Sequence, residues 1–125
     1  MIQPSEPFSV RSEREERAVH RITPAGELDI ATAAILENAF YEAFEDGGAE
    51  MIVVDLTELA FIDSTGLGVL VRMNAVCEHT DRLRIINGSP AVERLLDISG
   101  LRDRLPIIAS GSRPLAALPS PDDGR

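Results

Sequence analysis

The stretch Phe61–Gly68 (FIDSTGLG) gathers the side chains of this sequence that are best suited to chemistry. An acid, Asp63, precedes two adjacent hydroxyls, Ser64 and Thr65, at the point where an apolar run changes from a strand pattern to a helix pattern. Any of the three can cap a helix with a side-chain oxygen, but one cap is enough. At least one hydroxyl is then free at a helix N-terminus, where anions are accepted. A phosphoryl group on Ser64 would fit there.

Catalytic interpretations of this stretch fail on spacing. A serine hydrolase elbow requires glycine two residues before the nucleophile, and Ile62 occupies that position. The glycines that follow Ser64 lack the third glycine of a dinucleotide fingerprint. A general base is also missing, because His20 lies on an early strand and His79 lies roughly 20 Å along the helix at 1.5 Å per residue. We therefore expect no catalytic residue and no cofactor.

Composition narrows the possible partners. The 125 residues carry a formal net charge of −9, which repels nucleic acid and anionic lipid. All 12 basic residues are arginines, and the absence of lysine excludes a Walker phosphate loop and a Schiff base. Cys77 is the single cysteine and is expected to be buried, which excludes an internal disulfide and a zinc site with two thiolates. Without a membrane span or a secretion signal, we expect a soluble cytoplasmic protein with no metal site.

The periodicity of apolar residues predicts the order β-β-α-β-α-β-α-β. The expected bounds are 8–11, 18–23, 31–46, 51–56, 65–79, 83–86, 90–99 and 107–108. The charged stretch SEREER is expected to be the turn of a hairpin, and Pro24 to break the second strand's hydrogen bonding or to lie at an edge or bulge. Asp29 or Thr32 is the expected cap of the first helix, whose inward stripe includes Ile35.

Alternating strands and helices predict an α/β fold with one mixed, mostly parallel sheet, opened by the hairpin. The run MIVVDL is expected to be its central strand, covered on both faces. A single domain is predicted over residues 8–118, between a flexible arm at 1–7 and a flexible tail at 119–125. Leu115–Leu118 could add a short closing helical turn.

The helix expected from Thr65 is apolar on every side over almost two turns, because GLGVLV contains no polar residue. A helix that covers one sheet face needs a single apolar stripe, so the surplus indicates a partner protein. We expect Leu67, Gly68, Leu70 and Val71 to bind that partner. A helix buried on all sides within its own domain is the alternative.

Three segments carry a resemblance to a known family. They are GELDIATA (Gly26–Ala33), VVDLTELAFIDSTGLGVLV (Val53–Val71) and SPAVERLLDISGL (Ser89–Leu101). In order and spacing they resemble the STAS domain of bacterial anti-sigma factor antagonists, and the likeness covers about residues 8–108. The combination of G-E-L-D with D-S-T-G-L-G is specific, whereas either motif alone is weak. Pro24 and the proline-rich tail depart from the family pattern.

The resemblance implies a partner-switching regulator that is not an enzyme. Such antagonists bind an anti-sigma factor with serine kinase activity, which holds ATP and magnesium itself, and thereby release a sigma factor. The kinase phosphorylates the serine after the aspartate, here Ser64 and not Thr65, and a serine phosphatase restores it. The expected surroundings of this phosphosite are Glu27, Asp29, Asp63, Thr65 and Gly66. The alternative is a STAS module that regulates or scaffolds a signalling complex or transporter without phosphorylation.

Overall fold

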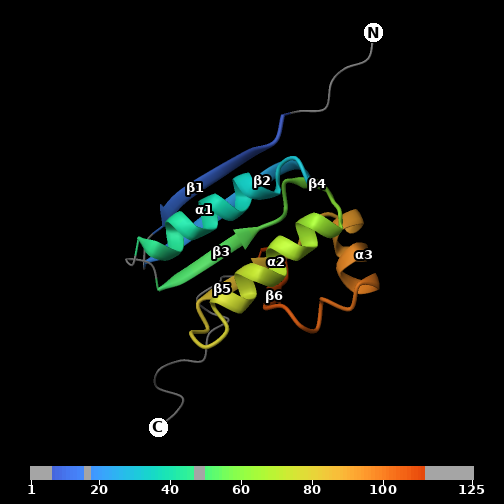
Figure 1. Cartoon of the computed structure of the whole chain (residues 1–125). Helices are drawn as coiled ribbons and strands as arrows, with labels where there is room; N and C mark the ends of the chain where they lie inside the picture. The colour runs from blue at the N-terminus through green and yellow to red at the C-terminus, as the bar shows by residue number, and fades with distance from the viewer. Residues whose placement is uncertain (1–6, 16–17, 47–49, 112–125) are drawn as a thin grey trace.

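A computed structural model describes residues 7–15, 18–46 and 50–111 of the chain (Figure 1). These residues form one six-stranded sheet and three helices. In chain order the elements are β1 (Ser9–Glu15), β2 (Val19–Leu28), α1 (Ala33–Glu45), β3 (Met51–Asp55), β4 (Leu59–Ile62), α2 (Ser64–Val76), β5 (Leu83–Ile86), α3 (Pro90–Ile98) and β6 (Ile107–Ile108).

The sheet has the strand order β1-β2-β3-β5-β6, with β4 paired to the far part of β2. The β1–β2 hairpin is antiparallel and every other pair is parallel. This confirms the predicted mixed, mostly parallel α/β sheet opened by a hairpin. Helices α1 and α2 lie side by side over one face of the sheet, and α3 lies at one side of the molecule (Figure 1).

Strand β4 is absent from the predicted order. It pairs in parallel with the last residues of β2, from Gly26 to Leu28. Strand β2 was expected to end before Pro24, but it continues through this proline. On one side of β2 the pairing with β3 ends at Ile22 and the pairing with β4 begins at Gly26. Pro24 therefore lies between the β2–β3 pairing and the β2–β4 pairing. On this side of β2, the N–H that proline lacks is not needed for a hydrogen bond between strands.

The hairpin also differs in detail from the expectation. The stretch SEREER was predicted to be its turn, but β1 runs through these residues to Glu15, which is paired with Val19. Charged side chains are tolerated there because β1 is an edge strand with a largely exposed surface. Residues 16 and 17, which belong to the predicted turn, lie outside the described residues.

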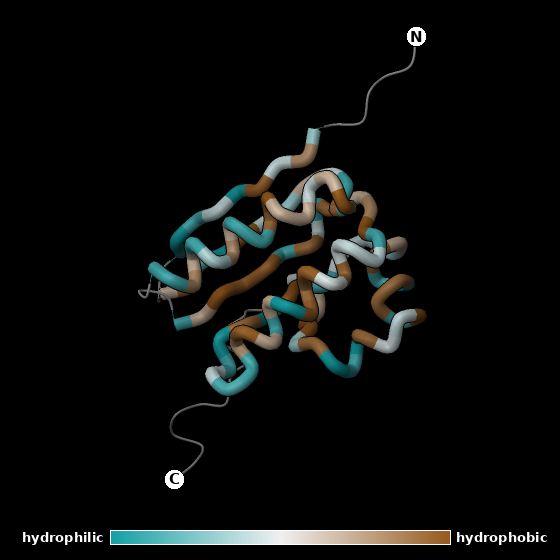
Figure 2. Tube along the Cα trace, viewed as in Figure 1, coloured by the Kyte–Doolittle hydropathy of each residue, from teal (hydrophilic) through white to brown (hydrophobic). Residues whose placement is uncertain are grey.

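The main core fills the space between the helices and the sheet, and a smaller cluster of Val19, Met51, Val53 and Ile86 lies on the opposite face. All of Met51–Val54 is buried, which confirms MIVVDL as a central strand with apolar side chains on both faces. Figure 2 shows this strand as a strongly hydrophobic band through the middle of the molecule. Cys77 is buried, as predicted.

Helix α3 is capped at both ends. Ser89 Oγ accepts a hydrogen bond from the Val92 amide, and Pro90 takes the first helical position. Gly100 follows the helix with a φ of 78°, a conformation that favours glycine. The predicted turn at Leu115–Leu118 lies outside the described residues, as do Gly47 and Gly48, which follow the helix predicted over 31–46. No helix in the described ranges combines the length and the apolar composition needed to cross a bilayer.

Candidate functional site

The carboxyl ends of β2 and β4 bring the two predicted acidic segments together. Because these strands are parallel neighbours, Glu27 pairs with Phe61 and Leu28 pairs with Ile62. Immediately beyond the strands, the Asp63 amide donates a hydrogen bond to the Leu28 carbonyl at 3.1 Å. The loop that begins at Asp29 therefore lies alongside the start of α2, as expected from the sequence.

Asp63 is the residue that caps α2. Its backbone is extended, and its Oδ1 accepts a hydrogen bond from the Gly66 amide at 3.0 Å. The helix begins at Ser64, one residue earlier than predicted. Because Asp63 is the cap, neither following hydroxyl is needed for that purpose. Ser64 is exposed, and its hydroxyl makes no hydrogen bond to any described residue, whereas Thr65 is partly buried.

Replacement of Asp63 by alanine tests this assignment of the cap. Asp63→Ala leaves the Gly66 amide without its side-chain acceptor, so we expect the free energy of unfolding to fall by about 1 kcal/mol. That loss corresponds to a melting temperature lower by roughly 4 °C. The matched control is Ser64→Ala, which removes the neighbouring hydroxyl but no cap. Thermal unfolding should leave Ser64→Ala at the wild-type midpoint; equal losses in both variants would contradict the assignment.

The loop after β2 is closed by its own hydrogen bonds. Thr32 Oγ1 donates to the Glu27 carbonyl at 2.7 Å and accepts from the Asp29 amide at 3.0 Å. Asp29 Oδ1 accepts from the Ala31 amide at 3.0 Å. Thr32 takes the N-cap position of α1, but its hydroxyl bonds within the loop and caps no helical amide. These bonds fix the loop beside Ser64.

Two glycines of α2 have different surroundings. Gly66 is buried, and a Cβ built on it would lie 2.7 Å from Ile62 Cγ1 and 2.8 Å from Leu28 Cγ. The close approach of α2 to β2 and β4 therefore requires glycine at this position. On Gly68 a Cβ would meet only Arg72 Nη1, at 3.5 Å, which is an ordinary contact. Packing within the described part of the chain does not explain the second glycine.

The predicted partner-binding set is corrected by the packing of α2. Leu67 is 9% exposed and Leu70 is fully buried, because both side chains face the sheet. Neither side chain is available to a partner on this surface. The partial burial of Gly68 and the 42% exposure of Val71 leave these two residues accessible. The alternative of a helix buried on all sides is also wrong, since α2 keeps this accessible strip.

Two apolar residues near the site are missing from the sequence-based set. Ile30, in the loop after β2, is 82% exposed, and Ile35, in the first turn of α1, is 49% exposed. Ile35 was expected in the inward stripe of its helix. The exposure of Ile30 could have been predicted from the sequence. It follows Asp29 in a polar loop, outside any predicted helix or strand whose apolar face it could join.

An ion pair joins α1 to α2 next to this strip. Arg72 Nε and Nη2 donate to the two carboxylate oxygens of Glu37 at 2.7 and 3.0 Å. The hydrogen bond from Arg72 lowers the pKa of Glu37 below its usual value. The pair is the two-pronged arrangement that arginine and carboxylate favour, and it holds the guanidinium in a defined orientation.

Groups that could support catalysis do not gather around Ser64. His20 Nε2 is hydrogen-bonded to Ser12 in the hairpin at 2.7 Å, and His79 follows the far end of α2. Among the described residues, no cluster of three or more histidines, cysteines or acids has a metal-binding arrangement.

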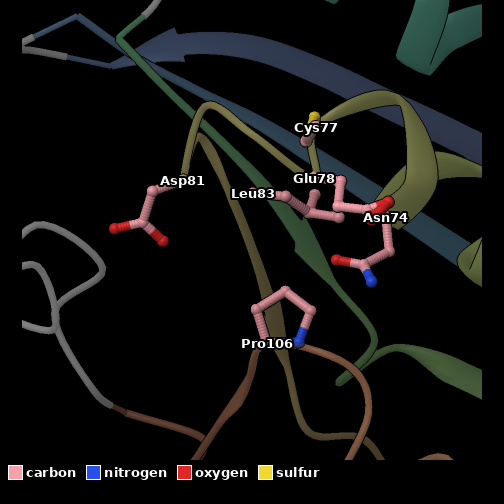
Figure 3. A pocket seen from close by; sticks show the side chains of 6 residues that line it. All are labelled: Asn74, Cys77, Glu78, Asp81, Leu83 and Pro106. Atoms are coloured by element: carbon pink, nitrogen blue, oxygen red, sulfur yellow. The ribbon is translucent and has the colours of Figure 1, made fainter.

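A small pocket of about 120 Å³ lies at the other end of α2 from Ser64. In Figure 3 the Asp81 carboxylate and the Cys77 sulfur point away from each other, so they form no acid–thiol pair. Burial raises the pKa of the Cys77 thiol, which disfavours the reactive thiolate. The pocket therefore offers no alternative reaction centre.

Comparison with known proteins agrees with this geometry. The family model for the STAS domain matches residues 13–111. The anti-sigma F factor antagonist of Paenibacillus polymyxa is 36% identical over 92 residues, which are 73% of this chain and 79% of that protein. A crystal structure of an anti-sigma factor antagonist from Mycobacterium paratuberculosis shares the fold, with a TM-score of 0.79 and 24% identity over 89% of this chain and 93% of that one.

A further similar structure is the anti-sigma factor antagonist SpoIIAA in its unphosphorylated form. It has a TM-score of 0.67 and 25% identity, over 83% of this chain and 90% of that one. SpoIIAA of Bacillus is also known in a phosphorylated form, which shares the fold at a TM-score of 0.64 and 23% identity, over 94% of this chain and all of that one.

Proposed function

The chain belongs to the STAS domain family, and on that premise we propose that it is an anti-sigma factor antagonist controlled by phosphorylation of Ser64. In this proposal it binds an anti-sigma factor that is also a serine kinase, and a sigma factor is released. The kinase supplies ATP and magnesium, and a serine phosphatase reverses the modification. The chain itself contributes a binding surface and a phosphate acceptor, and no catalytic group.

The observation that carries the proposal is the exposed hydroxyl of Ser64 beside the cap formed by Asp63. Because Asp63 already satisfies the helix end, Ser64 Oγ is available to a second protein. In the transfer, Ser64 Oγ would attack the γ-phosphorus of ATP, a base of the kinase would take the hydroxyl proton, and ADP would leave. Phosphorylated SpoIIAA supports the idea that a fold of this kind tolerates a phosphoryl group.

The fold itself should respond little to the phosphate. A phosphoryl group adds a charge of about −1.5 to −2 next to Asp63, with Asp29 in the adjacent loop. The helix dipole favours an anion at this end by about 0.3–1 kcal/mol, which offsets part of the repulsion. The main effect should therefore fall on binding.

We take Ile30, Ile35, Gly68 and Val71 as the docking surface for the anti-sigma factor. They lie on the neighbouring helices α1 and α2 and on the loop between β2 and α1, and three of them carry exposed apolar side chains. Gly68 carries no side chain of its own, and the guanidinium of Arg72 borders this part of the surface. A dianion at the edge of such a surface would have to be desolvated in the complex, which costs binding free energy.

A charge on the docking surface should weaken binding without modification of Ser64. We expect Val71→Glu to lower affinity for the anti-sigma factor by at least about tenfold, equivalent to 1.4 kcal/mol. Stability should change by no more than about 0.5 kcal/mol, because Val71 is at the surface. The matched control is Ile98→Glu on α3, which places the same charge on another exposed isoleucine. Equal losses in a calorimetric titration of both variants would remove Val71 from the docking surface.

The proposal is tested by purifying the tagged protein from its own host and mapping phosphate by mass spectrometry. We expect phosphate on Ser64 and co-purification of an anti-sigma factor with the unmodified form. If a stable partner is found while Ser64 never carries phosphate, the chain is instead a STAS module that is not controlled by phosphorylation.

A further inference from the structure

The guanidinium of Arg72 lies over Gly68, one helical turn from Ser64. Side chains on a helix lean towards its N-terminus, so a long side chain at position 72 covers the backbone one turn earlier. This is observed, because Arg72 Nη1 lies 3.5 Å from the Cβ position of Gly68. A Cβ at Gly68 would be in ordinary van der Waals contact with this nitrogen.

Two of the three guanidinium nitrogens of Arg72 are hydrogen-bonded to a described residue, and the third is not. Nε and Nη2 are held by the two carboxylate oxygens of Glu37. Nη1 makes no hydrogen bond to a described residue and is the nitrogen nearest to Gly68. The ion pair with Glu37 therefore orients a cationic donor along the α2 surface that leads to Ser64.

A phosphoryl group on Ser64 would be within reach of this donor. Positions 64 and 68 are four residues apart on one helix, so their Cβ positions are about 5–6 Å from each other. The phosphoryl group extends from the first and Arg72 Nη1 touches the second. The other charged groups around this end of α2, Glu27, Asp29, Asp63 and Glu37, are all acids, so none of them is a second cation for the phosphate. Of these carboxylates, Glu37 already accepts from Arg72, and it does so through Nε and Nη2, which leaves Nη1 for the phosphate.

We propose that Arg72 is the internal receptor for the phosphoryl group on Ser64: Nη1 binds a phosphate oxygen while Nε and Nη2 remain on Glu37. The resulting bridge from Glu37 through Arg72 to phosphoserine 64 fixes a charged group over Gly68. Phosphorylation then gives the guanidinium beside Gly68 a second anchor, in addition to adding charge. This inference rests on the proposed function, since it requires Ser64 to be phosphorylated.

The test uses the full chain with phosphoserine installed at position 64 during synthesis, so that no kinase is needed. The second pKa of the phosphate, ordinarily about 6, is measured by a ³¹P NMR pH titration. A nearby guanidinium favours the dianion and lowers this pKa. We expect Arg72→Gln to raise the pKa by about 0.5 relative to wild type. The matched control, Arg14→Gln, removes an equal charge where Arg14 pairs with Asp46 beyond the end of α1, and it should titrate like wild type.

Identical phosphate titrations in wild type and Arg72→Gln would overturn the proposal, as would an equal shift in Arg14→Gln. Neither result depends on a partner, so this test is separate from that of the proposed function. If the expected pKa difference is found but phosphoserine 64 leaves anti-sigma factor binding unchanged, Arg72 still receives the phosphate and the binding switch fails.

Discussion

Gly66→Ala is expected to lower the free energy of unfolding by about 2 kcal/mol, and the melting temperature by roughly 8 °C. The added methyl group would lie 2.7 Å from Ile62 Cγ1 and 2.8 Å from Leu28 Cγ, so α2 must move away from the strands that position the site. The gain in helix propensity, about 1 kcal/mol, is too small to compensate. Thermal or urea unfolding monitored by circular dichroism gives the measurement.

Gly68→Ala provides the matched control for this effect. The same substitution two residues along the same helix meets only Arg72 Nη1, at 3.5 Å. There the helix propensity of alanine should dominate and raise stability by up to about 1 kcal/mol. Opposite signs for Gly66 and Gly68 would confirm that one glycine serves the fold and that the other is free for a partner. A stability loss at both positions would contradict the proposed role of Gly68.

A permanent negative charge at Ser64 is expected to weaken anti-sigma factor binding by about 100-fold, or 2.7 kcal/mol. In Ser64→Asp the carboxylate lies at the start of the helix that carries the exposed Val71, and it must be desolvated on docking. The hydroxyl of Ser64 has no partner among the described residues, so its loss should not alter the fold. Calorimetric titration gives the affinity, and thermal unfolding should give a midpoint within about 2 °C of wild type.

Two variants serve as controls for the charge at position 64. Ser64→Ala removes the phosphate acceptor without adding charge and should bind like the unmodified protein under all conditions. Thr65→Asp adds the same charge one residue along, at a partly buried position. If Ser64→Asp binds as tightly as Ser64→Ala, negative charge at this position is not the signal. If Thr65→Asp is stable and Ser64→Asp is not, the expectation that the fold tolerates a charge at position 64 is contradicted.

Much of the fold could be predicted from the sequence because its strongest signals are local. The buried run at Met51–Asp55 and the Ser89-Pro90 start of α3 determine their elements without help from distant residues. Strand β4 has no such signal, since only Leu59 and Ile62 of its four residues face inward. Its conformation depends on pairing with the end of β2, more than 30 residues earlier in the chain.

In the candidate site, too, the local features could be predicted from the sequence and the features that depend on tertiary packing could not. The motif around Ser64 identified the helix start and the acidic neighbours, because capping and anion binding are local properties. The docking surface was predicted less well, since GLGVLV is apolar all round and contains no periodicity that shows which side meets the sheet. Leu67 and Leu70 were therefore assigned to the partner although they belong to the core. The position of Ile30 beside α2 depends on the tertiary pairing of β2 with β4.

The most direct test of the account compares one protein with and without phosphate on Ser64. The full chain and the same chain carrying phosphoserine at position 64 are each titrated by calorimetry into the cognate anti-sigma factor co-purified from the host. We predict tight binding for the unmodified chain and a dissociation constant larger by about 100-fold for the phosphorylated one. Equal dissociation constants would contradict the claim that a phosphate at Ser64 controls this interaction.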